Sequence, residues 1–432
     1  MPPVNTFTQG AVGTGDRVSD IHAESWNPAV HKALPYHKFP MMTIMDAMAK
    51  GSGTISSRKH HWWEEAWEPY HGAILDVYTN ASLATAYVSG GVEGTALYIA
   101  VTAAHAAQVR EGDDILITNT TNNTLRVVRT IGVQITNDTT SYIAVTLAET
   151  DTGNILAQTD LSWGTMADAQ AEGSELPTAI SHDPQGYENV TQIMMESIEH
   201  TGSELSESQR ISGSKREKSK RDAMSRFKMK EEWANLFGIY KIGTGSNSKR
   251  KSHMRGAYQA ISTNDPTNII DWRTASGYSG TFLNSGLNWI KEVAKDASVY
   301  SEATAKTCFA GHTAWAAISD AVEDRGYFKL ETRQTAFGIK IKTLVGLTQD
   351  WNIILCPTMS LRGFGSSMFV TEMDLIRKKV FRPLKFVKAN DRNDDGYTFV
   401  DAKKEGFYQE TTQEIVNTRT MRWLDGIGED HS

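Results

Sequence analysis

Cysteine is scarce in this sequence, with only Cys308 and Cys356 among 432 residues. Two cysteines are too few for the disulfide frameworks that stabilise small secreted domains. We therefore expect a chain that folds in a reducing cytoplasm, with both cysteines as small, buried hydrophobic side chains. The 40% of hydrophobic residues is enough to build real cores, and the length allows two or three packing units.

Long apolar runs and an excess of positive charge are also missing. No run approaches the roughly 20 apolar residues of a membrane span, and the opening residues MPPVNTFTQG lack the basic and apolar regions of a signal peptide. The net charge of −7 argues against a protein whose main surface binds nucleic acid, because neutralising phosphates requires a basic footprint. We expect no membrane contact and only local contact with DNA.

Catalytic motifs are absent from the sequence as well. The twelve histidines are scattered, no Gly-x-Ser-x-Gly elbow occurs, and neither cysteine lies in a nucleophile motif. The stretch Gly243 to Gly245 is not a phosphate loop, because no glycine precedes Lys249 and the flanks lack a strand-to-helix pattern. We expect neither an enzyme nor a cofactor.

A long helix over Ser203 to Tyr240 is the most prominent element that is present. No proline interrupts it, and its apolar residues form one narrow stripe opposite a fully charged face. Gly238 is a plausible stop, and a helix of this length would extend about 50 Å. We expect it to lie across a sheet or against another copy of the chain; the alternative is a solvated helix on its own domain. The stripe comprises Ala223, Phe227, Ala234 and Phe237.

Short β-rich runs follow one another between Ala81 and Trp163. They lie at Ala96 to Thr102, Asp114 to Thr118, Thr124 to Thr130 and Tyr142 to Leu147, with turn signals between them. This pattern predicts a small antiparallel β module at the tip of a projecting hairpin. Its legs would be the aromatic segment before it and Asn189 to His200 after it. The module is expected to be a decoration, although it could also bind a sugar or a peptide.

The aromatic segment KHHWWEEAWEPYHGAI is the densest aromatic patch in the sequence. We expect Trp62, Trp63 and Trp67 to be buried against a neighbouring subunit, as large aromatic residues are at interfaces. A metal site is the weaker hypothesis, because zinc requires three or four ligands at a recognisable spacing. That hypothesis places His61 and Glu65 on one helix face, and its other candidates are His60, Glu64 and His71.

The acidic stretch Asp391 to Gly396 resembles the opening of a calcium loop, with Asp391, Asn393 and Asp395 as its oxygen ligands. Position twelve of that loop is Ala402, where a bidentate glutamate would be required. We expect a tight β-hairpin turn here rather than a calcium site.

The remaining sequence predicts an α+β fold. Residues 1–38 are polar and aperiodic and predict an extended arm, and Met41 to Lys50 has helical spacing. Amphipathic helices are expected at Gly286 to Ala297 and Ala314 to Arg325. Strands are expected at Thr307 to Ala310, Ile339 to Leu344 and Asn352 to Cys356, with long strands at Asp374 to Val387 and Glu405 to Thr420.

This order of parts resembles the major capsid proteins of tailed bacteriophages with the Hong Kong 97-type fold, and more closely the subgroup with a β insertion in the extended loop. The resemblance rests on NVTQIMMESIEHTGSE before the long helix, EEWANLFGIY at its end, RGAYQAISTND after it and the late segment MFVTEMDLIRKKVFRPL. It implies an N-terminal arm and short helix at 1–57, an extended loop at 58–200 containing the β module at 81–166, a spine helix and connector of the peripheral domain at 201–254, an axial-type α/β domain at 255–404 and a closing strand of the peripheral domain at 405–432.

The resemblance implies a structural function in a virion capsid, assembled in the cytoplasm of the host bacterium. Hexamers and pentamers would form an icosahedral shell around double-stranded DNA, which the shell would contact weakly. The implied partners are further copies of the chain, a portal protein, a separate scaffold protein and decoration proteins. Interface residues are expected among Trp62, Trp63, Trp67, Phe227, Trp233 and Phe237. Two alternatives remain open: an encapsulin-type compartment shell, and a carbohydrate- or peptide-binding surface protein built around the β module.

Overall fold

A computed structural model of the chain describes residues 39–47, 53–65, 70–119, 121–167, 169, 172–173, 179, 183–206, 215–325, 329–334, 340–345, 347–388 and 402–431. The chain divides into two compact units. The larger unit comprises Met1–Trp62 and Tyr187–Ser432, and the smaller comprises Trp63–Gly186. The expected arm at 1–38 and the acidic turn at Asp391 to Gly396 lie outside the described residues.

The long helix of the larger unit is α4, Lys215–Phe237, preceded by the short helix α3, Gly202–Ser206. The sequence predicted one helix from Ser203 to Tyr240; residues 207–214 lie outside the described chain, and α4 alone is about 35 Å long. The predicted stop at Gly238 is confirmed. A Cβ atom there would lie 2.4 Å from the carbonyl oxygen of Ala234, so only glycine fits at this helix end.

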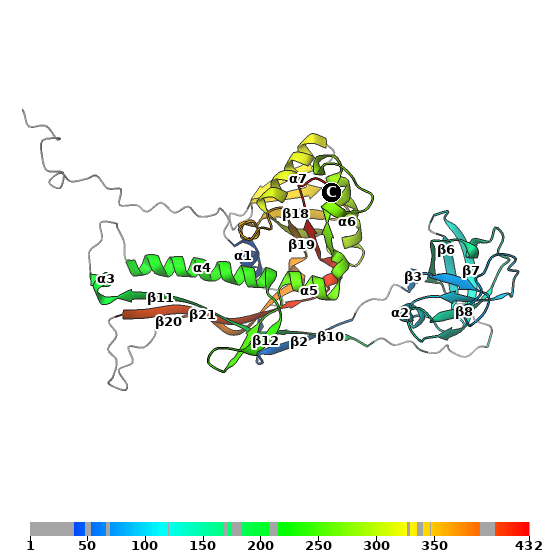
Figure 1. The fold of residues 1–432 in the computed structure, drawn as a ribbon, viewed down its shortest axis with the longest axis horizontal. Coiled ribbons are helices and arrows are strands. Elements are labelled where there is room, and N and C mark those ends of the chain that lie inside the picture. The colour runs from blue at the N-terminus through cyan, green and yellow to red at the C-terminus, as the bar shows by residue number, and fades with distance from the viewer. Residues whose placement is uncertain are drawn as a thin grey trace, which may run out of the picture. The chain divides into compact units, whose positions relative to one another are not determined.

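Helix α4 lies along one face of a four-stranded sheet (Figure 1). A small cluster comprising Met194, Ile198, Ala223, Phe227 and Phe407 fills the space between them. In order across the sheet, the strands are β1 (Gly53–Thr54), β20 (Ile376–Lys388), β21 (Ala402–Ile415) and β11 (Gln192–Thr201).

Strand β11 corrects one expectation from the sequence. As a leg of a projecting hairpin, Asn189 to His200 would have no partner along most of its length in an unassembled subunit. Instead β11 pairs with β21 without interruption, from Gln192 opposite Thr411 to Thr201 opposite Ala402. The long strand expected near the C-terminus therefore completes a sheet begun much earlier in the chain.

A seven-stranded mixed sheet forms the α/β part of the larger unit. The strand that follows β21 in the sequence belongs to this sheet, whereas β21 itself belongs to the four-stranded sheet. The end of the described chain therefore contributes one strand to each of the two sheets. In order across the sheet, the strands are β14 (Ile269–Asp271), β22 (Arg422–Asp425), β19 (Met368–Thr371), β15 (Ala305–Ala310), β18 (Asp350–Leu355), β17 (Lys340–Val345) and β16 (Lys329–Gln334). The three strands predicted between Thr307 and Cys356 are β15, β17 and β18, with boundaries shifted by up to two residues.

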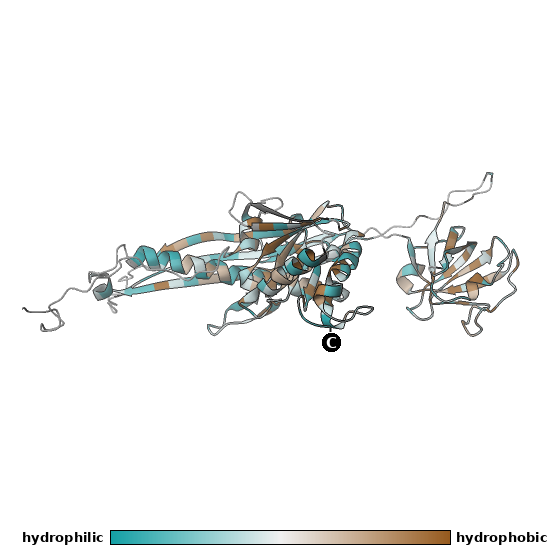
Figure 2. Cartoon of the chain, turned by 90° about the horizontal axis from the view of Figure 1, so that it is seen from above, coloured by the Kyte–Doolittle hydropathy of each residue, from teal (hydrophilic) through white to brown (hydrophobic). Residues whose placement is uncertain are grey.

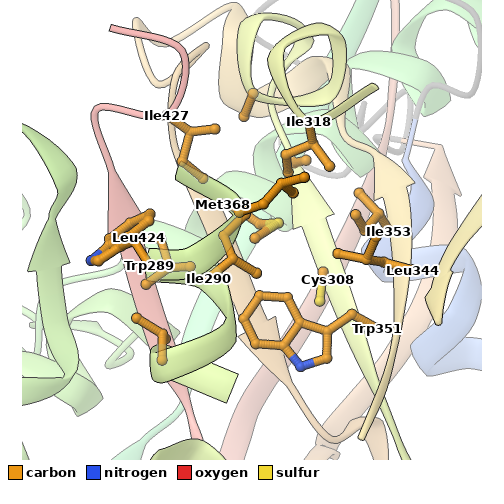
Figure 3. Close-up of a cluster of buried hydrophobic side chains, with 14 of the residues drawn as sticks. Trp289, Ile290, Cys308, Ile318, Leu344, Trp351, Ile353, Met368, Leu424 and Ile427 are labelled. Carbon is orange, nitrogen blue, oxygen red and sulfur yellow. The ribbon is translucent and has the colours of Figure 1, made fainter. Parts of the chain in front are cut away.

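Both faces of this sheet are buried because its strands alternate apolar residues between two cores. Cys308 and Ala310 join one core, whereas Phe309 between them joins the other. The first core packs under helices α6 (Phe282–Ser298) and α7 (His312–Arg325), which contain the two amphipathic helices predicted from the sequence. Figure 3 shows part of it, with Trp351 beside Cys308 and Ile290.

The second core lies on the other face and ties the end of α4 to the sheet. Leu236 of α4 and Trp423 of β22 belong to it, and so do Met41 and Met45. These methionines lie on α1 (Pro40–Ala47), which is shorter than the predicted helix because residues 48–50 lie outside the described chain. The helices α5 (Ala257–Asn264) and α8 (Pro357–Ser360) complete this layer.

Two small hairpin-like sheets complete the larger unit. The first pairs β12 (Lys241–Thr244) with β13 (Arg250–His253), immediately after α4. The second pairs β2 (Lys59–Glu64), the aromatic segment, with β10 (Gln185–Val190). These two strands therefore associate, as two legs of one hairpin would.

The smaller unit contains a second seven-stranded sheet that closes on itself. Its edge strands β3 (His71–Ala73) and β4 (Asp76–Tyr78) belong to one continuous stretch, which bonds to β9 on one side and β5 on the other. Between them Ile74 N–H donates to Leu161 and Leu75 N–H donates to Ala100. The order of the strands is β3, β9 (Leu161–Thr165), β6 (Asp114–Asn119), β7 (Thr124–Gln134), β8 (Tyr142–Leu147), β5 (Ala96–Ala100) and β4, with the short helix α2 (Ala103–Ala106).

The interior of this closed sheet is an apolar core of its own. Val77, Ile99, Ile117, Val145 and Trp163 are among its buried members. The four β-rich runs predicted between Ala96 and Leu147 correspond to β5, β6, β7 and β8. The expected β module at 81–166 thus lies within the smaller unit, which has a hydrophobic core of its own.

Candidate assembly surfaces

Strand β2 presents its aromatic residues alternately, because successive side chains of a strand point to opposite faces. Trp62 is half-buried and stacks on Tyr187, with ring centroids 6.1 Å apart. Trp63 points the other way and is 71% exposed. Trp67 lies outside the described residues. Of the two tryptophans of this segment that the structure describes, Trp63 is the one with most of its surface uncovered in the subunit.

The helix assumed by the metal hypothesis is wrong for this segment. It placed His61 and Glu65 on one helix face, but His61 lies in a strand and its Nδ1 lies 3.7 Å from a carboxylate oxygen of Glu188. Within the described residues, no group of His, Cys, Asp or Glu side chains is arranged to hold a metal ion.

The three aromatic residues predicted on the long helix contact their own subunit. Phe227 is buried in the cluster between α4 and its sheet, and Phe237 stacks on Phe364 with ring centroids 4.6 Å apart. Trp233 donates its indole N–H to the carbonyl of Thr358 at 3.2 Å, and the guanidinium of Arg362 lies 3.7 Å from its ring centroid. Much of the apolar stripe is therefore used for packing within the subunit.

The long helix also buries two carboxylates, which the sequence reasoning missed. In Figure 2 the helix is mostly coloured as hydrophilic. Glu231 is 3% exposed and lies 2.8 Å from Lys378 Nζ, which also lies 3.3 Å from Asp46 of α1. Glu232 is fully buried. Glu231 follows Phe227 by four residues, so it lies on the apolar stripe itself. A charged residue on that stripe was the signal in the sequence that could have revealed its burial.

Glu232 joins three segments that are distant in the sequence. Its carboxylate accepts hydrogen bonds from the Met42 backbone N–H of α1, at 3.3 Å, and from the Thr358 hydroxyl of α8. The thiol of Cys356 lies 3.5 Å away. Burial raises the pKa of Glu232 to about 7, and these hydrogen bonds only partly oppose it. Helix α1 is thereby attached to α4 through a carboxylate that titrates near neutral pH.

The face of the four-stranded sheet opposite α4 is covered by charge pairs. Glu410 of β21 is 1% exposed, accepts a hydrogen bond from Thr191 at 2.7 Å and lies 2.6 Å from the Arg382 guanidinium. Glu414 accepts from His60 Nε2 at 2.7 Å and lies 3.1 Å from Lys379. Burial would raise the pKa of Glu414, but His60 and Lys379 outweigh it and hold that pKa below its usual value.

The same face also exposes apolar side chains. Ile193 pairs with Glu410 and Met195 pairs with Tyr408, so both side chains lie on this face rather than under α4. Ile193 is 41% exposed and Met195 is 67% exposed. Val387, which pairs with Gly406, is 44% exposed on the neighbouring strand β20. This face therefore combines buried ion pairs with uncovered apolar surface, as a contact surface for another protein would.

Both cysteines are fully buried in the described chain, as expected. Burial raises the pKa of the Cys308 thiol and that of the Cys356 thiol, so neither is ionised near neutral pH. Neither is therefore an activated nucleophile. Among the helices that the structure describes, none has the length and apolar content needed to cross a bilayer.

Among solved structures, the chain is similar to phage proteins and to an encapsulin. A chain of Microbacterium phage Oxtober96 is 9% identical with a TM-score of 0.42, and the match covers 95% of this chain and 97% of that chain. The capsid of Myoviridae phage XM1 is 10% identical with a TM-score of 0.39, over 60% of this chain and 81% of that chain. The SrpI encapsulin of Synechococcus elongatus PCC 7942 is 11% identical with a TM-score of 0.39, over 58% of this chain and 79% of that chain.

The sequence itself matches a protein family over most of its length. A comparison with curated proteins found no match. The family model described as SU10 major capsid protein, however, matches residues 36–427, from just before α1 to just beyond β22. This match confirms the resemblance to a major capsid protein that was drawn from the sequence. The chain belongs to the SU10 major capsid protein family.

Proposed function

We propose that this chain is a structural subunit that self-assembles as hexamers and pentamers into an icosahedral shell enclosing the double-stranded DNA of a phage. The observation that carries the proposal is the family match over residues 36–427. The surfaces described above support it, because they leave large apolar side chains uncovered on an otherwise well-packed subunit.

The function we infer is mechanical rather than catalytic. Trp62, Trp63 and Trp67 lie in the outgoing leg of the extended loop, which we assign to 58–200, and they contact a neighbouring subunit. A fully covered tryptophan buries about 150 to 250 Å². Ile193 and Met195 provide a second apolar contact surface beside the charge pairs of β21.

The proposed partners are those of a capsid assembled in the host bacterial cytoplasm. They are further copies of the chain, a portal protein, a separate scaffold protein and decoration proteins. Residues 1–57 serve as arm and short helix, anchored where Met42 meets Glu232.

Electron microscopy of the purified protein tests the proposal. We expect closed shells with five- and six-fold capsomers, and nuclease-protected DNA inside particles isolated from infected cells. Shells that contain cargo protein instead of DNA would favour an encapsulin-type compartment. A compact monomer under all assembly conditions would contradict both shell functions and favour a binding protein built around the smaller unit.

A further inference from the structure

A stretch without carboxylates follows the buried glutamates of α4. Between Glu232 and Asp265 the sequence contains no Asp or Glu, but it contains five Lys or Arg residues. The chain as a whole carries a net charge of −7, so this segment is a local basic island. Three of its cations are consecutive, at Lys249, Arg250 and Lys251.

The fold places this basic island on the hairpin formed by β12 and β13. Every residue of β12 is exposed, and so are Lys249, Arg250 and Lys251. The turn between the strands is ordered by backbone hydrogen bonds, with Gly245 N–H donating to Lys249 at 2.7 Å. The cations therefore stand on a defined hairpin rather than on an irregular loop.

The two faces of the hairpin differ. Lys241 pairs with His253 and Gly243 pairs with Lys251, so one face carries only basic or small residues. Ser252 lies on the other face, where its hydroxyl donates to the carbonyl of Thr191 at 2.6 Å. One face of the hairpin therefore contacts the rest of the subunit, and the basic face points away from that contact.

The base of the hairpin is held firmly. The Gly256 N–H donates to the Gly238 carbonyl at 2.7 Å, which brings the two ends of the segment together. Between them, Tyr240 donates its hydroxyl to Glu188 at 2.8 Å, and the Arg255 guanidinium lies 5.4 Å from the Tyr240 ring centroid. A fixed base presents the cations at the same place in every subunit.

These cations differ from others of the larger unit because no described carboxylate neutralises them. Lys306 lies 2.9 Å from Glu372, and Lys378 lies 2.8 Å from Glu231. In contrast, no ion pair joins Lys241, Lys249 or Lys251 to a carboxylate of the described chain. The charge on this face is available to an external anion.

We propose that the β12–β13 hairpin binds phosphate groups of the enclosed double-stranded DNA through Lys241, Lys249 and Lys251. The proposal rests on the proposed function, since it assigns the weak DNA contact of the shell to one place. The basic face carries no Phe, Tyr or Trp to stack on bases, so the contact follows the phosphate backbone and is independent of DNA sequence. With about three phosphate contacts per subunit, each contact is weak and released by salt, which lets DNA move while the shell fills.

Full-length subunits that have not assembled allow a direct test. The hairpin variant changes Lys241, Lys249 and Lys251 to glutamine. The control variant removes the same number of charges from exposed positions elsewhere in the larger unit, at Lys291, Lys295 and Lys404. Fluorescence anisotropy with a labelled DNA duplex of arbitrary sequence then gives the binding constant between about 50 and 200 mM salt.

We expect the hairpin variant to bind DNA at least roughly tenfold more weakly at low salt, and its log–log salt slope to fall by about 3. The control variant should retain the slope of the unmodified chain. Equal salt slopes for both variants, or no DNA binding by the unmodified chain, would overturn the proposal. So would a hairpin variant that binds DNA normally but no longer forms shells, because the hairpin would then be a contact between subunits. Shell formation by the unmodified chain is scored separately, so failure of DNA binding is distinguished from failure of the capsid function.

Discussion

The backbone N–H of Met42 in α1 donates to the buried carboxylate of Glu232 in α4, with the nitrogen 3.3 Å from Oε2. On the other side of the same carboxylate, the hydroxyl of Thr358 donates from α8. The attachment of the N-terminal segment to the spine helix therefore depends on one side chain whose charge changes near neutral pH.

Replacing Glu232 with glutamine should remove a pH dependence of stability. Burial raises the pKa of Glu232 from 4.5 to about 7, so the folded subunit retains a proton that the unfolded chain has lost. This contribution destabilises the subunit progressively as pH rises from 4.5 to 7, by on the order of 3 kcal/mol. Urea unfolding of unassembled subunits at pH 5 and pH 8 should show Glu232→Gln close to the unmodified chain at pH 5 and more stable at pH 8.

Glu217→Gln is the matched control, since Glu217 is exposed on the same helix. It should leave the pH dependence unchanged. If Glu232→Gln kept the same loss of stability between pH 5 and pH 8 as the unmodified chain, Glu232 would not be the titrating group.

Arg382→Met should destabilise the subunit by roughly 2 to 3 kcal/mol, because it leaves the buried Glu410 carboxylate without its closest cation. Adding Glu410→Leu to that variant should recover most of the loss, since the uncompensated charge is then gone. Lys404→Met is the control: its pair with Glu199 is exposed and should contribute less than about 1 kcal/mol. Urea midpoints measure all three, and a double variant no better than Arg382→Met would contradict this account.

Trp63→Ala should impair assembly without weakening the subunit. Trp63 is 71% exposed, so its loss should change the free energy of unfolding by less than about 0.5 kcal/mol. Trp423→Ala, in the fully buried second core, should cost about 3 to 5 kcal/mol. Thermal melting of free subunits and shell yield by sedimentation give the two readings. Normal shell yield for Trp63→Ala would exclude this tryptophan from the subunit contacts.

Gly256→Ala should destabilise the subunit by more than about 2 kcal/mol. A Cβ atom at Gly256 would lie 2.4 Å from the backbone nitrogen of Gly238, and backbone atoms cannot turn aside as a side chain can. Gly243 lies on the hairpin between these two glycines, and a methyl group added there has no atom within 4 Å. Gly243→Ala should therefore be nearly neutral. Chemical unfolding compares the two variants. Similar midpoints would show that the close approach of Gly238 and Gly256 does not limit which residue fits at position 256.

Local signals predicted much of this fold. The residues from Thr307 to Ala310 predicted a strand, and Gly238 marked the end of the helix, because both signals depend on neighbours in the sequence. The strands of the smaller unit were predicted because turn residues separate short β-rich runs.

Long-range pairings could not be predicted in this way. Glu232 meets Thr358 across more than a hundred residues, so its burial depends on partners that no local pattern identifies. The same holds for β11, whose partner β21 lies at the other end of the sequence. Intersubunit contacts are harder still, since Trp63 is exposed in the subunit whatever it contacts in an assembly.

The closed sheet of the smaller unit has a consequence for crowding. One continuous stretch, His71 to Tyr78, supplies both of its outer strands: β3 bonds to β9 at one end of the stretch, and β4 bonds to β5 at the other. Open edges at high local concentration recruit strands from other molecules and initiate amyloid-like association. In the shell proposed above, many copies of this unit would be held at a high local concentration. Because its outer strands β3 and β4 have only three residues each, this sheet presents little backbone edge to strands of other copies.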